Sequence, residues 1–350
     1  MDCYLLGQRP GLESMLTFHA LARLGREALV IVSPASPMIS LGFFEDAAAV
    51  LDLENIEAAG WPIFRREVGG GTTYLDRNQI FYQLVIGSDH PLARRPVMDL
   101  YRLMADPARR AYQTVGIVTE FKPVNDVVTD QGLKISGQGG GDIGECLVLV
   151  GGLLLDFDAA AFCRMVNVPD EKFRDKLFTT VEQNVTSIRK ELGFIPQRSV
   201  LEAALREGFE QLLGPLTIKT DLEGPVKAEM ARLEEKFSST EWIRRGRKKG
   251  HKAGIKVASG VYLRSRTHKA EGGLIRAEVS QRDGKLEKVE LSGDLTVLPR
   301  RRLAELEEAL IGVEADQESV LRAVRGFLSG HEAQMPGVTP LDLARTIAAD

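Results

Sequence analysis

Three consecutive glycines restrict what the stretch around them can form. Such a run weakens any helix or strand that contains it, and it lets backbone N–H groups approach a ligand closely. Two arginines precede the glycines, and guanidinium groups can hold phosphate or carboxylate oxygens bidentately. We interpret the segment as a loop that binds an anionic ligand, either a nucleotide or an acyl phosphate. In chain order its residues are Arg65, Arg66, Gly69, Gly70, Gly71, Thr72, Thr73, Tyr74 and Asp76.

The composition is that of a globular protein with a sizeable core. The chain has 350 residues, 44% hydrophobic and 27% charged, and this length favours two or three domains. A net charge of −4 argues against bulk binding to nucleic acid. Membrane spans need roughly 20 apolar residues in a row, and no run approaches that length. With three cysteines and no signal peptide, the expected compartment is the cytoplasm.

The patterns of apolar residues predict a mixture of strands and helices in the first two thirds of the chain. The predicted strands cover 28–32, 38–42, 62–66 and 79–86, followed by a hairpin at 126–137 and a buried strand or strand pair within 146–158. The predicted helices cover 14–25, a segment ending at 55–60, the surroundings of 98–105, and 185–192, 199–213 and 227–237. His19, on the first of these helices, is expected to pack or cap.

A basic, glycine-broken run from Arg244 to Lys252 is the best candidate for a domain boundary. After it, three strands are predicted at 260–263, 273–281 and 286–291, and two helices at 302–310 and 318–328. This tail of about 90 residues is long enough for a small α+β domain.

A second informative segment surrounds the predicted hairpin. Asn125 precedes its first strand, Asp126 begins that strand, and Lys134 follows the turn. The pattern alone favours a solvated lysine that alternates with buried neighbours. A lysine that points into a cleft, where it neutralises a phosphate or polarises an acyl carbonyl, is the functional alternative.

Taken together, the two segments resemble the lipoate–protein ligases, relatives of the biotin–protein ligases and octanoyltransferases. The shared order is an Arg-Arg-x-x-Gly-Gly-Gly loop ending in an acid, an Asn-Asp pair, a Gly-x-Lys-Ile-Ser-Gly strand and an apolar Gly-x-Leu-Leu-Leu run. The tail is similar to the accessory domain of bacterial ligases, including the segment 291–295. The resemblance implies an α+β fold, with a mixed sheet flanked by helices in a catalytic domain (1–243), a basic hinge or linker (244–255) and a small α+β accessory domain (256–350).

The resemblance also implies two half-reactions. ATP activates lipoate as lipoyl-AMP, and a lysine of an acyl-carrier domain then attacks the mixed anhydride. Lys134 is expected to contact both the lipoyl carbonyl and the α-phosphate, where charge develops in each step. Asn125 and Asp126 are expected to line the nucleotide side, with Asp126 the candidate contact for magnesium or ribose. Arg66, the glycine loop and Ser136 are expected to bind the nucleotide and the acyl group.

Three departures from the family pattern mark a divergent branch. Family members carry a histidine just before the acid of the loop, where this chain has Leu75. They often carry a His-His-Gly before the leucine-rich strand, where this chain has Leu149, Val150 and Gly151. The loop after Lys134 is replaced by the glycine run 139–141 and an aspartate. An altered acyl pocket, an altered carrier protein, or both are expected.

Two other functions remain open from the residues alone. An ATP-independent octanoyl or lipoyl transferase needs a thiolate beside the lysine. Cys146 lies near in sequence, but its acidic and apolar neighbours favour a buried structural thiol, and Cys163 is also expected to be structural. A non-catalytic acyl- or nucleotide-binding protein is the second alternative, and the retained Arg66, Asp126 and Lys134 argue against it.

The expected partner is a lipoyl carrier domain with acidic character, which a basic hinge could steer electrostatically. Lipoate, ATP and Mg²⁺ are the expected ligands, and no nucleic acid or membrane partner is expected. A monomer is the default expectation for a ligase with its accessory domain attached. The identity of the acyl chain is left open, because pocket shape decides it.

Overall fold

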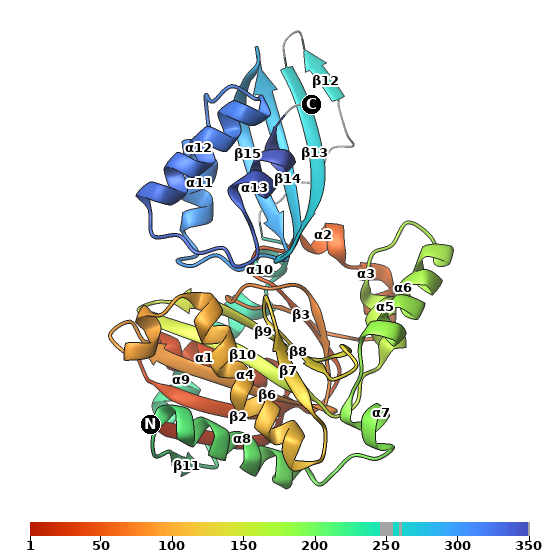
Figure 1. Cartoon of the computed structure of the whole chain (residues 1–350), viewed down its shortest axis with the longest axis vertical. Helices are drawn as coiled ribbons and strands as arrows, with labels where there is room; N and C mark the ends of the chain where they lie inside the picture. The colour runs from red at the N-terminus through yellow and green to blue at the C-terminus, as the bar shows by residue number, and fades with distance from the viewer. Residues whose placement is uncertain (246–254, 259–260, 349–350) are drawn as a thin grey trace.

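The computed structural model describes residues 1–245, 255–258 and 261–348. One eight-stranded sheet organises the chain up to residue 245, and a separate four-stranded sheet with helices on one side follows it (Figure 1). This arrangement confirms the expected α+β fold with an extra C-terminal domain. The domain boundaries stay predictions, because most of the predicted basic linker, 246–254, lies outside the described residues.

The large sheet has the strand order β11-β1-β2-β6-β10-β9-β8-β7. β1 runs parallel to β2 and β11, whereas each neighbouring pair from β2 to β7 is antiparallel, so the sheet is mixed. Its strands are β1 (Asp2–Arg9), β2 (Ala28–Pro34), β6 (Gln79–Gly87), β7 (Thr119–Lys122), β8 (Asp126–Thr129), β9 (Lys134–Ile143), β10 (Cys146–Leu154) and β11 (Thr217–Lys219). The predictions missed β1, β7 and β11, and the segment 146–158 contains a single strand, β10.

Helices cover both faces of this sheet, and the sheet separates two hydrophobic cores. On one face, α4 buries Leu100, Met104, Ala108 and Ala111, whose spacing of three and four residues makes a helical stripe. On the other face, α1 packs with its neighbour α9 around Phe237. The principal helices are α1 (Gly11–Arg23), α4 (Val97–Thr114), α8 (Arg198–Leu213) and α9 (Gly224–Ser238).

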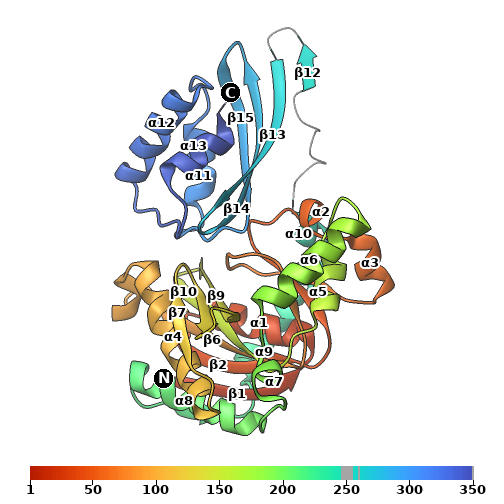
Figure 2. The ribbon, with the colours of Figure 1, turned by 45° about the vertical axis from the view of Figure 1, so that its right-hand side comes forward.

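A small sheet and several short helices complete this part of the chain. The three strands, in the order β4-β3-β5, are β3 (Met38–Leu41), β4 (Ile63–Arg65) and β5 (Thr73–Leu75). The helices are α2 (Ala47–Val50), α3 (Leu53–Ala58), η1 (Pro91–Arg94), α5 (Ala159–Met165), α6 (Glu171–Asn184), α7 (Ile188–Leu192) and α10 (Thr240–Arg244). Figure 2 shows α5 and α6 standing beside the sheet, on the side away from α4. Across the described ranges, every helix is too short or too polar to traverse a lipid bilayer.

The glycine run 139–141, which replaces the loop of the family pattern, lies inside β9. These residues pair in register with 148–150 of β10. Their missing side chains let the first glycine loop pack directly against the strand. An ideal Cβ on Gly141 would lie 2.9 Å from the Cα of Val68, and one on Gly139 would lie 3.2 Å from the carbonyl oxygen of Gly69. Sheet pairing on one side and close backbone packing on the other outweigh the weak strand propensity of glycine.

The accessory domain packs its helices against a sheet of order β12-β13-β14-β15. Its elements are β12 (Ile255–Ala258), β13 (Val261–Ala270), β14 (Gly273–Arg282), β15 (Lys285–Gly293), α11 (Arg302–Ala309), α12 (Gln317–Gly330) and α13 (Pro340–Ile347). The predictions found three of the strands and two of the helices but missed α13. That helix begins with a capping box between Thr339 and Asp342, a signal readable in the sequence.

Candidate functional site

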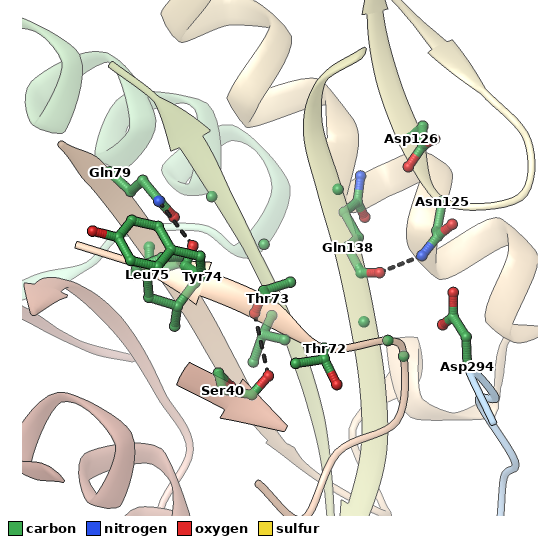
Figure 3. A pocket seen from close by; sticks show the side chains of 18 of the residues that line it. Ser40, Thr72, Thr73, Tyr74, Leu75, Gln79, Asn125, Asp126, Gln138 and Asp294 are labelled. Carbon is green, nitrogen blue, oxygen red and sulfur yellow. Dashed lines mark hydrogen bonds between the residues drawn. The ribbon is translucent and has the colours of Figure 1, made fainter. Parts of the chain in front are cut away.

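A cavity of about 480 Å³ opens where the first glycine loop, β9, β10 and the accessory domain meet (Figure 3). Most of the residues predicted to form a site line it: Arg66, Gly70, Gly71, Thr72, Thr73, Tyr74, Asn125, Asp126 and Lys134. They come from three separate segments of the chain, 66–74, 125–126 and 134, which the fold brings together. The cavity therefore joins the two motifs that the sequence singled out.

Besides Arg65, three predicted residues do not line the cavity. Gly69 packs against the accessory domain, where an ideal Cβ would lie 2.5 Å from the carbonyl oxygen of Leu295. Asp76 accepts a hydrogen bond from the backbone N–H of Asn78 at 2.8 Å and thereby closes a turn. Ser136 donates to the carbonyl of Gly152 at 2.6 Å, between β9 and β10. The observed contacts of these residues are with other parts of the protein, chiefly its backbone.

The two arginines before the glycine loop are buried and hold backbone carbonyls. Arg66 donates to the carbonyls of Ser40, Gly69 and Gly71, and it fixes the loop from beneath while facing the cavity. Burial lowers its pKa to about 10, so the guanidinium keeps its charge at neutral pH. Arg65 donates on the other side of the strand, to carbonyls that include those of Gly42, Phe43, Glu45, Trp242 and Ile243. The sequence suggested direct anion binding for both arginines, and the geometry leaves Arg66 as the one at the cavity.

The N–H groups of the glycine loop are only partly available to a ligand. The N–H of Gly69 donates to the carbonyl of Gly140 at 2.9 Å, and that of Gly70 donates to the carbonyl of Leu295 at 2.8 Å. Gly70 has a φ of +88°, a conformation that favours glycine. The remaining part of the loop, from Gly71 to Thr73, faces the cavity. Two of the three glycines thus serve close packing of backbone on backbone.

Lys134 begins β9 and reaches the cavity beside Asp126. Its Nζ lies 2.7 Å from Oδ1 of Asp126, and both side chains are partly exposed. The absence of a side chain at Gly137 makes room for this pair, because an ideal Cβ there would lie 3.2 Å from both Cε and Nζ of Lys134. Asn125 is fixed next to them, since its side-chain amide donates to the carbonyl of Gln138 (Figure 3). A cation, a carboxylate and an amide therefore converge at one end of the cavity.

The accessory domain supplies residues that the predictions did not name as site residues. Figure 3 shows Asp294 reaching from this domain toward Asn125 and Asp126. An ideal Cβ on Gly71 would lie 3.0 Å from the carboxyl carbon of Asp294. Burial raises the pKa of Asp294 above its ordinary value, and the nearby cation of Lys134 opposes that rise. Lys269 also lines the cavity. The segment 291–295 carried a family resemblance, but nothing in the sequence placed it at the site.

The other end of the cavity is largely apolar. Its wall includes Met15 and Phe18 of α1, Phe81 of β6 and the aliphatic residues Leu75 and Val150. The last two are the positions where the family pattern has histidines. The predicted change in the pocket therefore falls on the cavity wall itself.

None of the three cysteines is among the residues that line the cavity. Cys3, Cys146 and Cys163 are free and buried. Burial raises the pKa of the Cys146 thiol, and the carboxylates of Glu27 and Glu145 raise it further. Burial likewise raises the pKa of the Cys163 thiol. A protonated, enclosed thiol is a poor nucleophile.

The described residues include no cluster of three or more histidine, cysteine, aspartate or glutamate side chains that could hold a metal ion alone. A magnesium ion carried by nucleotide phosphates needs only one or two protein oxygens. Asp126 and Asp294 both present carboxylates to the cavity, and burial together with the Asp126 charge raises the pKa of Asp294. Two neighbouring carboxylates of this kind fit a phosphate-bound magnesium ion.

Comparison with known proteins agrees with this geometry. Residues 11–210 match the family model of the lipoyl protein ligase A/B catalytic domain. The octanoyltransferase LipM of Kyrpidia tusciae is 25% identical over 227 residues, which cover 59% of this chain and 82% of that protein. Because the family model covers more than half of the chain, the chain belongs to the lipoyl protein ligase A/B family, whose members are ligases and acyltransferases.

Solved structures share the fold. The lipoate protein ligase of a bipartite archaeal lipoylation system from Thermoplasma acidophilum superposes with a TM-score of 0.62 at 24% identity, covering 71% of this chain and 99% of that chain. A lipoate-protein ligase A bound with ATP superposes with a TM-score of 0.58 at 20% identity, covering 70% of this chain and 99% of that chain. LipL1 of P. falciparum, in complex with lipoate, superposes with a TM-score of 0.69 at 12% identity. This match covers 93% of this chain and 94% of that chain, so it includes the accessory domain.

Proposed function

We propose that this chain is an ATP-dependent lipoate–protein ligase. The observation that carries the proposal is the cavity wall, which combines Lys134 and a glycine loop at one end with an apolar end and includes none of the chain's cysteines. Without a thiolate, the acyl group needs another means of activation, and formation of an acyl adenylate provides it. A lipoate ligase bound with ATP and one in complex with lipoate share this fold, which supports the choice of ligands.

The proposed reaction has two steps. In the first, a carboxylate oxygen of lipoate attacks the α-phosphorus of ATP, the bond to the β-phosphate bridging oxygen breaks, and pyrophosphate leaves. In the second, the ε-amine of a carrier lysine attacks the acyl carbonyl, AMP leaves with the electron pair of the broken C–O bond, and the amine loses a proton. Negative charge develops on the α-phosphate in the first step and on the carbonyl oxygen in the second.

Lys134 is the proposed catalytic residue because its ammonium group can stabilise both charges. The α-phosphate and the acyl carbonyl are adjacent in the acyl adenylate. A single ammonium group placed between nucleotide and acyl group can therefore stabilise the negative charge of both steps. Arg66 and the segment 71–74 are proposed to position the phosphates and the acyl carboxyl. Asn125 and Asp126 are proposed to line the nucleotide, with Asp126 able to contact a phosphate-bound magnesium ion.

The proposed partner is a lipoyl carrier domain. One of the structures with this fold comes from an archaeal system that also contains an E2 lipoyl domain. We assign catalysis to 1–243, a basic hinge to 244–255 and an accessory role to 256–350. The accessory domain reaches the cavity through Asp294, so it has to be considered part of the working site.

Lipoate-dependent ATP–pyrophosphate exchange tests the proposal directly. The wild type is expected to catalyse exchange, and Lys134→Ala is expected to reduce it by at least about 100-fold while the thermal midpoint stays close to that of the wild type. Cys146→Ala is the matched control at a reactive residue type outside the cavity. Exchange that persists in Lys134→Ala would remove the assigned role of this lysine.

An ATP-independent octanoyltransferase is the second candidate, because the LipM relative is an octanoyltransferase. The two functions differ in the molecule that donates the acyl group. Transfer of octanoate from an acylated carrier to a lipoyl domain without ATP, combined with an absence of exchange, would replace the ligase by the transferase.

A further inference from the structure

The accessory domain contributes a cation to the cavity wall that the proposed mechanism does not use. Lys269, near the end of β13, is exposed and lines the cavity. Within the described residues it forms no hydrogen bond and no ion pair. The two other cations of the wall are engaged, Arg66 with backbone carbonyls and Lys134 with the carboxylate of Asp126 at 2.7 Å. Lys269 is therefore the cation of the described wall that is left for an anionic ligand.

The strand register fixes the side of the accessory sheet from which Lys269 projects. Ala270 and Ile275 belong to the hydrophobic core of the accessory domain, beneath its helices. Side chains alternate between the two faces of a strand, and Lys269 pairs with Leu274 of β14. Both residues therefore project from the face of the sheet that carries no helix, and the ammonium group of Lys269 points away from the accessory core.

A short chain of contacts connects Lys269 with the glycine loop. Gly273 begins the neighbouring strand β14, and an ideal Cβ on it would lie 2.9 Å from the carboxyl carbon of Asp294. The same carboxyl carbon would lie 3.0 Å from an ideal Cβ on Gly71. Burial raises the pKa of Asp294, and the cations of Lys134 and Lys269 oppose this rise. Both ammonium groups therefore lie within electrostatic reach of one carboxylate at the cavity.

The direction in which pyrophosphate leaves follows from in-line displacement at phosphorus. The attacking and leaving oxygens lie on opposite sides of the phosphorus atom. In the proposed reaction the acyl chain occupies the apolar end of the cavity, so the carboxylate attacks from that side. Figure 3 shows Asp294 of the accessory domain across the cavity from Leu75, a residue of the apolar wall. The β- and γ-phosphates consequently extend toward the accessory domain.

Resting on the proposed function, we propose that Lys269 binds the β- and γ-phosphates of ATP. After adenylation it holds the pyrophosphate, which leaves with the electron pair of the broken P–O bond. A lysine suits this task because its ammonium group is a compact charge on a flexible stem, able to follow the phosphates as they separate from the adenylate. AMP and lipoate lack these phosphates, so the contribution of Lys269 is specific to ATP and pyrophosphate.

Equilibrium binding to the full chain without lipoate, where no adenylate can form, tests the inference. The probes are ATP, AMP and inorganic pyrophosphate, each with magnesium chloride, and the measurement is titration calorimetry. Lys269→Gln is expected to weaken the binding of ATP and of pyrophosphate by about 10-fold and to leave the affinity for AMP within about two-fold of the wild type. Lys269→Arg keeps a cation and is expected to retain most of the ATP affinity.

Lys288→Gln is the matched control. Lys288 is exposed and pairs with Ser280 of β14, an even number of residues from Leu274, so it projects from the same face of the sheet as Lys269. It is not among the residues that line the cavity. This substitution removes the same charge from the accessory domain, so an effect of net charge alone would appear in both variants. The ATP affinity of Lys288→Gln is expected to stay within about two-fold of the wild type.

An unchanged ATP affinity in Lys269→Gln would overturn the inference, as would an equal loss for ATP and AMP or an equal loss in Lys288→Gln. Pyrophosphate exchange reports on the proposed function separately. ATP binding that depends on Lys269, without lipoate-dependent exchange, would overturn the ligase and keep the phosphate site. Exchange together with full ATP affinity in Lys269→Gln would keep the ligase and overturn the phosphate site. A wild type that binds none of the probes would overturn both.

Discussion

The backbone N–H of Gly70 donates a hydrogen bond to the carbonyl oxygen of Leu295 at 2.8 Å, which ties the glycine loop to the accessory domain. Further contacts reinforce this link. Tyr101 donates to Thr296 at 3.2 Å, and Arg276 of the accessory domain lies 3.2 Å from the carboxylate of Glu45. The loop that should bind the substrate is therefore part of the interface between the two domains. A movement of the accessory domain will therefore displace the glycine loop.

Gly69→Ala is expected to loosen this interface. The added methyl group would lie 2.5 Å from the carbonyl oxygen of Leu295 and 2.8 Å from the Cα of Thr296, and backbone atoms cannot yield cheaply. The variant should lose roughly 1–3 kcal/mol of stability and show faster amide hydrogen exchange around residue 295. Gly326→Ala, where an added Cβ meets nothing within 4 Å, is the control. Unchanged exchange in Gly69→Ala would mean that the loop does not hold the domain.

Gly137→Ala is expected to misplace Lys134. The new Cβ would lie 3.2 Å from Cε and Nζ of the lysine, so the ammonium group has to shift by a few tenths of an ångström. We expect kcat for pyrophosphate exchange to fall by about ten-fold with little loss of stability. Combined with Lys134→Ala, the glycine change should have no further effect. An additive effect in the double variant would show that Gly137 acts by another route.

Cys146→Ala is expected to leave activity within about two-fold of the wild type, because the thiol is buried away from the cavity and its pKa is raised. Stability should fall by roughly 1 kcal/mol. Steady-state rates of lipoyl transfer to a carrier domain, with and without ATP, provide the measurement. A loss of activity far larger than the loss of stability would restore the thiol mechanism.

His19 is expected to make stability fall in mild acid. Burial lowers its pKa to about 4 from an ordinary 6.5. Its Nδ1 hydrogen-bonds the carbonyl of Met15, and its Nε2 accepts from the N–H of Glu67, so the ring is neutral in the fold. The neutral ring of His19 therefore stabilises the fold fully above pH 6.5. This contribution to the free energy of unfolding, about 3 kcal/mol, is lost as the pH falls toward 4.

The difference between wild type and His19→Gln isolates this term. Glu45 titrates in the opposite sense, because burial raises its pKa to about 7, and it is present in both proteins. Urea unfolding of both between pH 4 and 7.5 should show the two free energies converging as the pH falls. Parallel curves would exclude His19 as the titrating group.

Local sequence patterns determined much of the fold and one half of the site. Strand β6 follows from its aromatic and β-branched residues, and helix α4 follows from periodic burial. The order of motifs brought Lys134, Asp126 and the glycine loop into one hypothesis. These features are local because side-chain alternation and turn chemistry act over a few residues.

Tertiary structure alone decided the rest. The glycine run 139–141 is a strand because β10 pairs with it and the loop before Gly70 packs on it. Asp294 and Lys269 reach the cavity only because a distant part of the chain packs beside the glycine loop. Gly69, Asp76 and Ser136 look the same in sequence as their neighbours at the cavity, yet their contacts lie within the protein and outside the cavity wall. Burial and register, which depend on contacts between remote parts of the chain, separate a residue that faces a ligand from one that supports it.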